Sequence, residues 1–234
     1  GALAEYLTVL AANAIPTDPE VNSDIAALAE PVAVAMHGFD RLSAIGITSG
    51  PVAILGAGTI GLCAATVGSL QNFGPTVVLD TVAAKAEAAA HFDAEPYHIQ
   101  PEEDYRATLA GVETALRGKP SVVIDAVGTS SSFSLAFQMS RPDAALLVIG
   151  NLAKKVSLPL QDLVSDEVTI IGSYGFDFLS FRASVAALPK LANRLGTFIE
   201  SRCSLDEVPA VMTALARGER HERKIIVDAT SRTP

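Results

Sequence analysis

The chain has 234 residues, enough for one large domain or for one domain with part of a second. Hydrophobic residues make up 49% and charged residues 18%, a balance typical of a folded globular protein rather than a disordered chain. With 17 basic and 26 acidic residues the net charge is −9, which argues against nucleic acid or an anionic membrane surface as a partner. No apolar run approaches the roughly 20 residues that span a bilayer, and two cysteines, Cys63 and Cys203, suit a reducing cytoplasm.

The N-terminal region predicts a strand at residues 2–10, followed by a loop rich in Pro, Asp and Asn. The C-terminal region begins with an extended stretch at residues 199–203, continues with a helix near residues 205–217 and closes with a strand at residues 224–227. Neither end is large enough to bury a core alone. We therefore expect residues 1–31 and 199–234 to form one partial domain together.

Between these ends, short β-branched runs alternate with alanine-rich helical stretches. The strands are continuously apolar, which is typical of a parallel sheet covered by helices on both faces. This order predicts a doubly wound α/β domain over residues 32–198. We expect strands at residues 51–55, 76–79, 121–124, 145–149 and 168–171, and helices at residues 61–70, 82–92 and 131–139.

A glycine-rich loop with the pattern G-x-G-x-x-G follows the first of these strands. Gly56 allows the tight turn, Gly58 lets the backbone approach a pyrophosphate, and Gly61 lets the helix pack closely on the sheet. Asp80 ends the next strand, where a carboxylate accepts hydrogen bonds from the adenosine ribose and repels a 2′-phosphate. The pattern predicts a dinucleotide site that favours NAD over NADP. A tight turn without a ligand and a methyltransferase nucleoside site are the alternatives.

Three further segments follow strands of the predicted sheet. Lys85 lies five residues after Asp80, either in contact with the adenosine ribose or as a solvated helix lysine. Residues 125–128 turn sharply after one strand, and Gly150 with Asn151 ends the next. Because the carboxyl ends of parallel strands form the ligand crevice of such sheets, we expect these loops either to line the site or to be simple turns.

In order and spacing, these elements resemble the medium-chain, zinc-type alcohol dehydrogenases, most closely the branch with sorbitol, threonine and butanediol dehydrogenases. The resemblance rests on Ala-Glu-Tyr at residues 4–6, E-P-x-x-x-x-x-H at residues 30–37, the glycine loop, Asp80 with Lys85, the D-x-x-G turn at residues 125–128, Ile-Gly-Ser at residues 171–173 and Arg223-Lys224 before the last strand. It implies a Rossmann domain with remnants of a second, mostly β, GroES-like domain at both ends.

The resemblance also implies functional roles for matching positions. It implies NAD as the cofactor, a small-molecule alcohol as the substrate, and a homodimer or homotetramer that pairs through a sheet edge at residues 168–171. Val34 would lie beside the nicotinamide, and Arg223 or Lys224 would approach the pyrophosphate. His37 belongs to the matching motif, and we expect it to be a packed helix residue. The expected cofactor-binding residues are Val34, Gly56, Gly58, Thr59, Ile60, Gly61, Asp80, Lys85, Val127, Gly128, Ile149, Asn151 and Arg223.

Zinc is the point at which this sequence departs from the family. The family's zinc-binding cysteine and His-Glu pair precede the Ala-Glu-Tyr element, and this sequence begins at that element. Glu30 matches a residue at or just behind the catalytic zinc, or else caps its helix, and one carboxylate cannot hold a zinc that needs three protein ligands. We therefore expect zinc only in a complete form of the protein.

Two explanations of the short chain lead to two functions. If it is the C-terminal two-thirds of a dehydrogenase, the intact protein transfers hydride between a secondary alcohol and NAD. If it is a natural short form, it is a non-catalytic or repurposed NAD(H)-binding module. A transferase that uses another nucleoside is a third possibility.

Overall fold

The computed structural model describes residues 3–140 and 142–230, and the chain divides into two compact units. One unit comprises residues 29–184, and the other comprises residues 1–28 together with residues 185–234. The assignment of residues 32–198 as a dinucleotide-binding domain and of the two ends as a partial catalytic domain stays a prediction.

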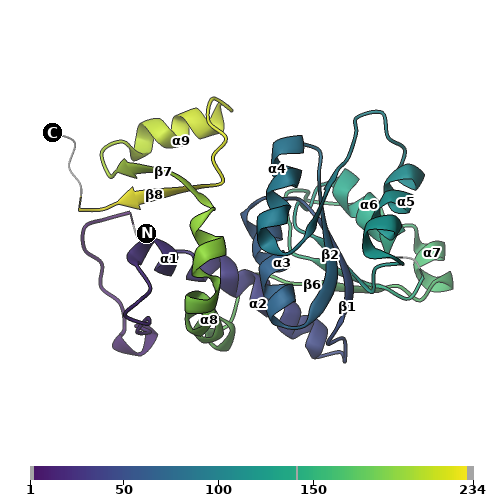
Figure 1. Ribbon diagram of the computed structural model, residues 1–234, viewed down its shortest axis with the longest axis horizontal. Coiled ribbons are helices and arrows are strands. Elements are labelled where there is room, and N and C mark those ends of the chain that lie inside the picture. Colours follow the sequence, from purple (N-terminus) through teal and green to yellow (C-terminus); the bar gives the residue numbers. More distant parts are fainter. Residues whose placement is uncertain (1–2, 141, 231–234) are drawn as a thin grey trace. The chain divides into compact units, whose positions relative to one another are not determined.

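A parallel sheet forms the centre of the unit of residues 29–184 (Figure 1). Its strands lie in the order β3-β2-β1-β4-β5-β6, so the chain runs from β1 to one edge and returns beside β1 to reach the other. This is the doubly wound order of a Rossmann fold, which confirms the predicted fold class. The strands are β1 (Gly50–Leu55), β2 (Phe73–Asp80), β3 (Glu95–His98), β4 (Val122–Asp125), β5 (Ala145–Val148) and β6 (Thr169–Gly172).

Helices cover both faces of this sheet (Figure 1). On one face α2 (Ala29–Ser43) packs against α3 (Thr59–Leu70), and the Phe39 ring of α2 lies 4.9 Å from the Phe73 ring of β2. On the other face α5 (Tyr105–Leu116) and α6 (Ser130–Met139) share a buried cluster with Ala53 and Leu55 of β1. Alternate residues of β1 thus face opposite helix layers, as expected for a buried parallel strand. The same unit contains α4 (Ala83–Glu87), the 3₁₀ helix η2 (Ala88–Phe92), α7 (Leu160–Ser165) and the start of α8 (Phe178–Gly196).

The second unit contains a separate pair of parallel strands. They are β7 (Ile199–Ser204) and β8 (Lys224–Asp228), with α9 (Val208–Ala216) packed against β7. The N-terminal part of this unit holds the 3₁₀ helix η1 (Ala11–Asn13) and α1 (Ser23–Ala26).

Two predicted elements differ from the structure. The strand expected at residues 2–10 is wrong: residues 3–10 form no strand, and Ala2 lies outside the described residues. A strand needs a neighbour for its N–H and C=O groups, and the two sheets of the described chain consist of β1–β6 and β7–β8 alone. The helix expected at residues 82–92 is split into α4 and η2, a tightening that is common at the ends of helices.

Candidate functional site

The glycine loop connects β1 to α3, and two of its glycines are required by the packing of the loop itself. Gly56 has φ +96°, and a Cβ there would lie 2.6 Å from Cγ2 of Val127. A Cβ on Gly61 would lie 1.8 Å from the carbonyl oxygen of Gly56. Any larger residue at either position would therefore push the loop away from its neighbours.

Gly58 differs from these two glycines. Its φ of −79° and ψ of −175° suit any residue, and a Cβ there would have no heavy atom of the described chain within 4 Å. Gly58 precedes α3, whose first intrahelical hydrogen bond runs from the Leu62 N–H to the Gly58 carbonyl. The N–H groups at this helix start carry a partial positive charge. The open side of Gly58 therefore lets an anionic group approach the backbone.

Asp80 ends β2, the strand beside β1, and its carboxylate lies against the glycine loop. One oxygen, Oδ2, accepts a hydrogen bond from the Ala57 N–H, and Oδ1 accepts one from the Val82 N–H, both at 2.9 Å. A carboxylate has about four lone-pair sites, so these bonds leave capacity for the hydroxyls of a ligand. The structure thus brings Asp80 and the loop together, as the sequence pattern predicts.

The loops after β4 and β5 touch each other backbone to backbone. A Cβ on Gly128 would lie 2.1 Å from the carbonyl carbon of Gly150. Asp125, fully buried at the end of β4, organises this contact: its Oδ1 accepts the N–H groups of Val127 and Gly128, and the Ser132 hydroxyl donates to its Oδ2. Sequence reasoning treated Asp125 as part of a turn and missed this role, although a carboxylate in a wholly apolar strand is an unusual signal.

The remaining expected cofactor residues of this unit lie on helices or at strand ends. Thr59 and Ile60 are the first residues of α3, and both are half-buried. Val34 is half-buried on α2, and Lys85 is exposed on α4. Ile149 and Asn151 follow β5, where the Ile149 N–H donates to the Asp125 carbonyl at 3.0 Å. Their contacts with a cofactor stay predictions.

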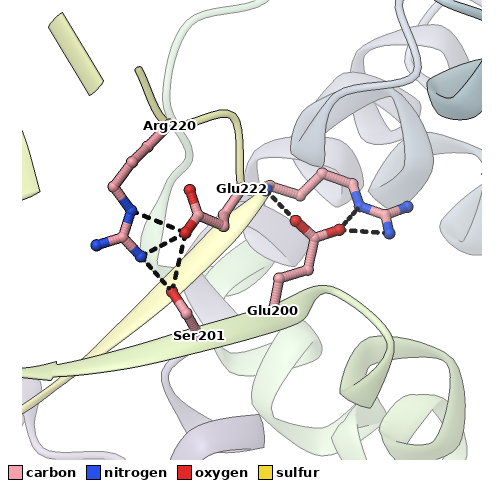
Figure 2. A network of polar contacts seen from close by, with 5 residues as sticks. Glu200, Ser201, Arg220 and Glu222 are labelled. Carbon is pink, nitrogen blue, oxygen red and sulfur yellow. Dashed lines mark hydrogen bonds and ion pairs between the residues drawn. The ribbon is translucent and has the colours of Figure 1, made fainter. Parts of the chain in front are cut away.

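Arg223 lies in the unit that holds β7 and β8, and its partner Glu200 belongs to a network of polar contacts with Ser201, Arg220 and Glu222 nearby (Figure 2). Its backbone N–H and its guanidinium both bind the Glu200 carboxylate, at 2.9 Å and 2.6 Å. Arg220 pairs with Glu222, and this hydrogen bond lowers the pKa of Glu222 to about 2. Arg223 is therefore held by an acidic partner, and its contact with a pyrophosphate stays a prediction.

Glu30 is exposed in the first turn of α2, where a carboxylate interacts favourably with the helix dipole. Within residues 3–140 and 142–230, no three His, Cys, Asp or Glu side chains are grouped so that they could hold a metal ion. The described residues therefore do not fit a catalytic zinc, which takes three protein ligands.

A cavity of about 450 Å³ continues the same edge of the sheet at the ends of β5 and β6. Its lining includes His37 and Arg41 of α2, Ile149 and Asn151 after β5, and Ser173 and Tyr174 after β6. Sequence reasoning expected His37 to be a packed helix residue and assigned no role to Arg41 or Ser173.

Comparison with known proteins places the chain in a family. A family model described as zinc-binding dehydrogenase matches residues 59–191, more than half of the chain. The chain belongs to the zinc-binding dehydrogenase family. A sorbitol dehydrogenase of Bombyx mori is 27% identical over 194 residues, which cover 82% of this chain and 55% of that protein. The chain thus spans little more than half of this relative's length.

Solved structures share the fold of this chain. An alcohol dehydrogenase of Thermotoga maritima superposes with a TM-score of 0.80 at 19% identity, covering 91% of this chain and 59% of its own. A short chain alcohol dehydrogenase of E. coli in complex with NADH superposes with a TM-score of 0.75 at 21% identity, and the match covers 94% of this chain and 63% of that chain. A putative zinc-binding dehydrogenase of Sinorhizobium meliloti bound to NADP superposes with a TM-score of 0.73 at 24% identity, and the match covers 85% of this chain and 58% of that chain. At these identities the likeness shows the fold.

Across the described ranges, no helix combines the length and the apolar character needed to cross a bilayer.

Proposed function

We propose that this chain binds NAD(H) at the carboxyl edge of its parallel sheet, as part of an alcohol or polyol dehydrogenase that acts on a small secondary alcohol. When bound, the nicotinamide supplies the hydride chemistry. The chain's own contribution is to bind and orient it. Gly58 and the start of α3 would hold the pyrophosphate, Asp80 the adenosine ribose, and the loops around Val127 and Asn151 the nicotinamide half.

The position of Asp80 carries this proposal. Its carboxylate is fixed by two backbone N–H groups, one from the glycine loop and one from the loop after β2. It can therefore accept bonds from ribose hydroxyls without moving, and its negative charge would repel a 2′-phosphate. This arrangement supports NAD over NADP, although dinucleotides of both kinds occur among the structural neighbours.

The test is the ratio of the dissociation constants for NADPH and NADH, measured on the wild-type chain and on Asp80→Ala. If the substitution only removed the two loop hydrogen bonds, it would weaken the binding of NADH and NADPH alike, and the ratio of their dissociation constants would not change. Loss of the ribose contact and of the repulsion lowers the ratio, by about tenfold or more.

The matched control for this test is Glu95→Gln, which removes a charge from the opposite end of the same sheet. Glu95 is exposed at the start of β3, away from the carboxyl edge. We expect the ratio of the NADPH and NADH dissociation constants of Glu95→Gln to equal that of the wild type. An Asp80→Ala ratio equal to the wild-type ratio would contradict the assignment of Asp80.

We propose zinc only for a form of the enzyme in which residues other than those described supply its ligands. Glu30 would then be one residue of its surroundings. We also propose a cytoplasmic location, supported by the two free cysteines Cys63 and Cys203.

Assembly into a homodimer or homotetramer is supported by the edge of the large sheet. Strand β6 lies at that edge, where no strand of the described residues pairs with its outer N–H and C=O groups, and Ile170 is 36% exposed. An apolar open edge is a template for pairing with a second copy. Sedimentation equilibrium should therefore give twice or four times the mass of the chain.

A further inference from the structure

The carboxyl ends of β2 and β3 lie side by side, and this places His98 next to Asp80. The two residues are partners in the parallel register, and the Ile99 N–H donates to the Asp80 carbonyl at 3.0 Å. The half-buried imidazole of His98 contacts the peptide group that follows Asp80, because its Nε2 lies 3.2 Å from the Thr81 carbonyl oxygen. None of the proposed cofactor contacts involves His98.

The Thr81 carbonyl and the Val82 N–H belong to one peptide group, and its two ends have different partners. The Val82 N–H donates to Oδ1 of Asp80 at 2.9 Å, while the Thr81 carbonyl accepts from His98. Thr81 and Val82 are both exposed, so packing does little to fix this peptide group. Because a trans peptide is planar and its N–H and C=O point in opposite directions, a rotation of the group would break both hydrogen bonds together.

The hydrogen bonds of His98 also determine which ring nitrogen carries the proton. A carbonyl oxygen can only accept, so Nε2 is the donor to Thr81, and Nδ1 of the neutral imidazole is then an acceptor. The side-chain amide of Gln100 lies 2.8 Å from Nδ1 and donates to it. Both ring nitrogens are thereby satisfied, which fixes the orientation of the imidazole.

Gln100 is in turn connected to α5. Its backbone N–H donates to Oε2 of Glu103 at 3.0 Å, and Oε1 of Glu103 accepts from the Tyr97 hydroxyl. Burial, and after it the hydrogen bond to Glu103, raise the pKa of Tyr97 to about 12, so the hydroxyl remains a donor. The Tyr97 ring lies over Gly111 of α5, where a Cβ would not fit. A continuous set of contacts thus runs from α5 to the peptide group after β2.

We propose that His98 is a positioning residue for cofactor discrimination. By holding the Thr81 carbonyl, it keeps the Val82 N–H on the Asp80 carboxylate, and so keeps the charge of Asp80 where it repels a 2′-phosphate. This inference rests on the proposed function, in which Asp80 binds the adenosine ribose. It assigns the preference for NADH over NADPH to the edge strand β3 as well as to Asp80 itself.

The first test needs no cofactor and follows the exchange of the Val82 amide hydrogen by NMR. In His98→Ala this hydrogen should exchange about three- to tenfold faster than in the wild type, because its peptide group has lost one of its two partners. The Ile99 amide, which belongs to the β2–β3 pair itself, should exchange at the wild-type rate. A Val82 rate equal to that of the wild type would overturn the inference.

The second test is the ratio of the dissociation constants for NADPH and NADH. His98→Ala should lower this ratio about three- to tenfold, because the Asp80 carboxylate is no longer held in one position. If His98 only stabilised the fold, its loss would weaken both cofactors alike and leave the ratio unchanged, which would contradict the proposal.

A double variant shows whether His98 acts through Asp80. Once Asp80→Ala has removed the carboxylate, the further change His98→Ala should leave the ratio of dissociation constants where it is. If His98→Ala lowered the ratio by the same factor in both backgrounds, His98 would act on the cofactor independently, and the positioning role would be wrong.

Two single variants serve as rescue and control. His98→Gln places an amide at this position, which can donate to the Thr81 carbonyl and accept from Gln100, so its ratio should be close to that of the wild type. His91→Ala removes an exposed histidine of η2 from the same unit and should leave the ratio unchanged. A His98→Gln ratio as low as that of His98→Ala would contradict the hydrogen bond to Thr81 as the cause.

These outcomes separate the inference from the proposed function. If Asp80→Ala lowers the ratio and His98→Ala does not, the dinucleotide site stands and the role of His98 is wrong. If the wild type binds neither cofactor, the proposed function fails and the role in discrimination fails with it. The Val82 exchange rate then still decides whether His98 holds the peptide group.

Discussion

The large sheet and the β7–β8 pair are both parallel, yet different interactions stabilise them. All four residues of β4 are buried, whereas all five residues of β8 are only half-buried. The β7–β8 pair instead carries ion pairs of Arg220 with Glu222 and of Arg223 with Glu200 (Figure 2). Partly exposed ion pairs contribute little, while apolar burial contributes about 25 cal/mol per Å². The comparison therefore predicts that the β7–β8 unit opens more readily than the sheet that carries the dinucleotide site.

The largest expected effect comes from a cavity in the central strand of the large sheet. Ile54 of β1 is fully buried, and Ile54→Ala should lower the free energy of unfolding by about 2–5 kcal/mol. Ile225→Ala in β8 removes the same atoms from a half-buried site and should cost less than half as much. Urea unfolding measures the loss in the free energy of unfolding for each variant. Hydrogen exchange, measured on peptide fragments, shows in which unit each substitution speeds exchange. Equal losses would contradict the comparison.

A smaller effect should follow from removing the buried carboxylate of β4. Asp125→Ala leaves the N–H groups of Val127 and Gly128 without their acceptor, and should cost about 1–3 kcal/mol in urea unfolding. Asp125→Asn is the matched control, since its amide oxygen can still accept both bonds. If the two variants were equally destabilised, the hydrogen bonds to the Val127 and Gly128 N–H groups would not explain how Asp125 stabilises the fold.

The smallest effect is expected in the polar network of β7 and β8, and it depends on pH. Arg220 lowers the pKa of Glu222 from its ordinary value of 4.5 to about 2. Because the folded value is the lower one, the stabilisation is complete above the ordinary value and is lost as the pH falls toward the folded value. At neutral pH, Glu222→Gln should therefore have a lower free energy of unfolding in urea than the wild type. This difference should shrink as the pH falls from 4.5 to about 2.

Glu219→Gln is the control for this pH dependence. Glu219 is exposed, and its carboxylate lies 3.9 Å from the Arg217 guanidinium. Its removal should therefore leave the dependence of the unfolding free energy on acidic pH unchanged. A Glu222→Gln difference that stayed constant down to the lowest pH would contradict the role of the ion pair.

The central strands and the glycine loop could be predicted from the sequence because their local pattern and their environment agree. Strand β1 is continuously apolar and is buried on both faces, so composition alone indicates its place. Asp80 could be placed against the loop because β2 is the neighbour of β1 in every sheet of this order.

Other features could not be predicted, because they depend on neighbours rather than on local pattern. Strand β3 has the sequence Glu-Pro-Tyr-His, without an apolar run, and forms because β2 offers it an edge. Residues 3–10 have a strand-like composition but belong to neither of the described sheets. The cavity lined by His37, Arg41 and Ser173 depends on how α2 packs beside β5, which no local pattern reports.

The most direct test of the central claim is a titration with NADH, and separately with NADPH, followed by nicotinamide fluorescence. The chain has no tryptophan, so its own emission does not interfere. Gly58→Ala adds a methyl group where the fold leaves open space, and Gly196→Ala adds one at the end of α8 with ordinary contact to Ile25.

We predict that the wild-type chain binds NADH more tightly than NADPH. Both variants should unfold at about the wild-type temperature, while Gly58→Ala alone should lose about tenfold or more in NADH affinity. Wild-type binding of neither cofactor, or Gly58→Ala binding NADH as tightly as the wild type, would contradict a dinucleotide site at this loop.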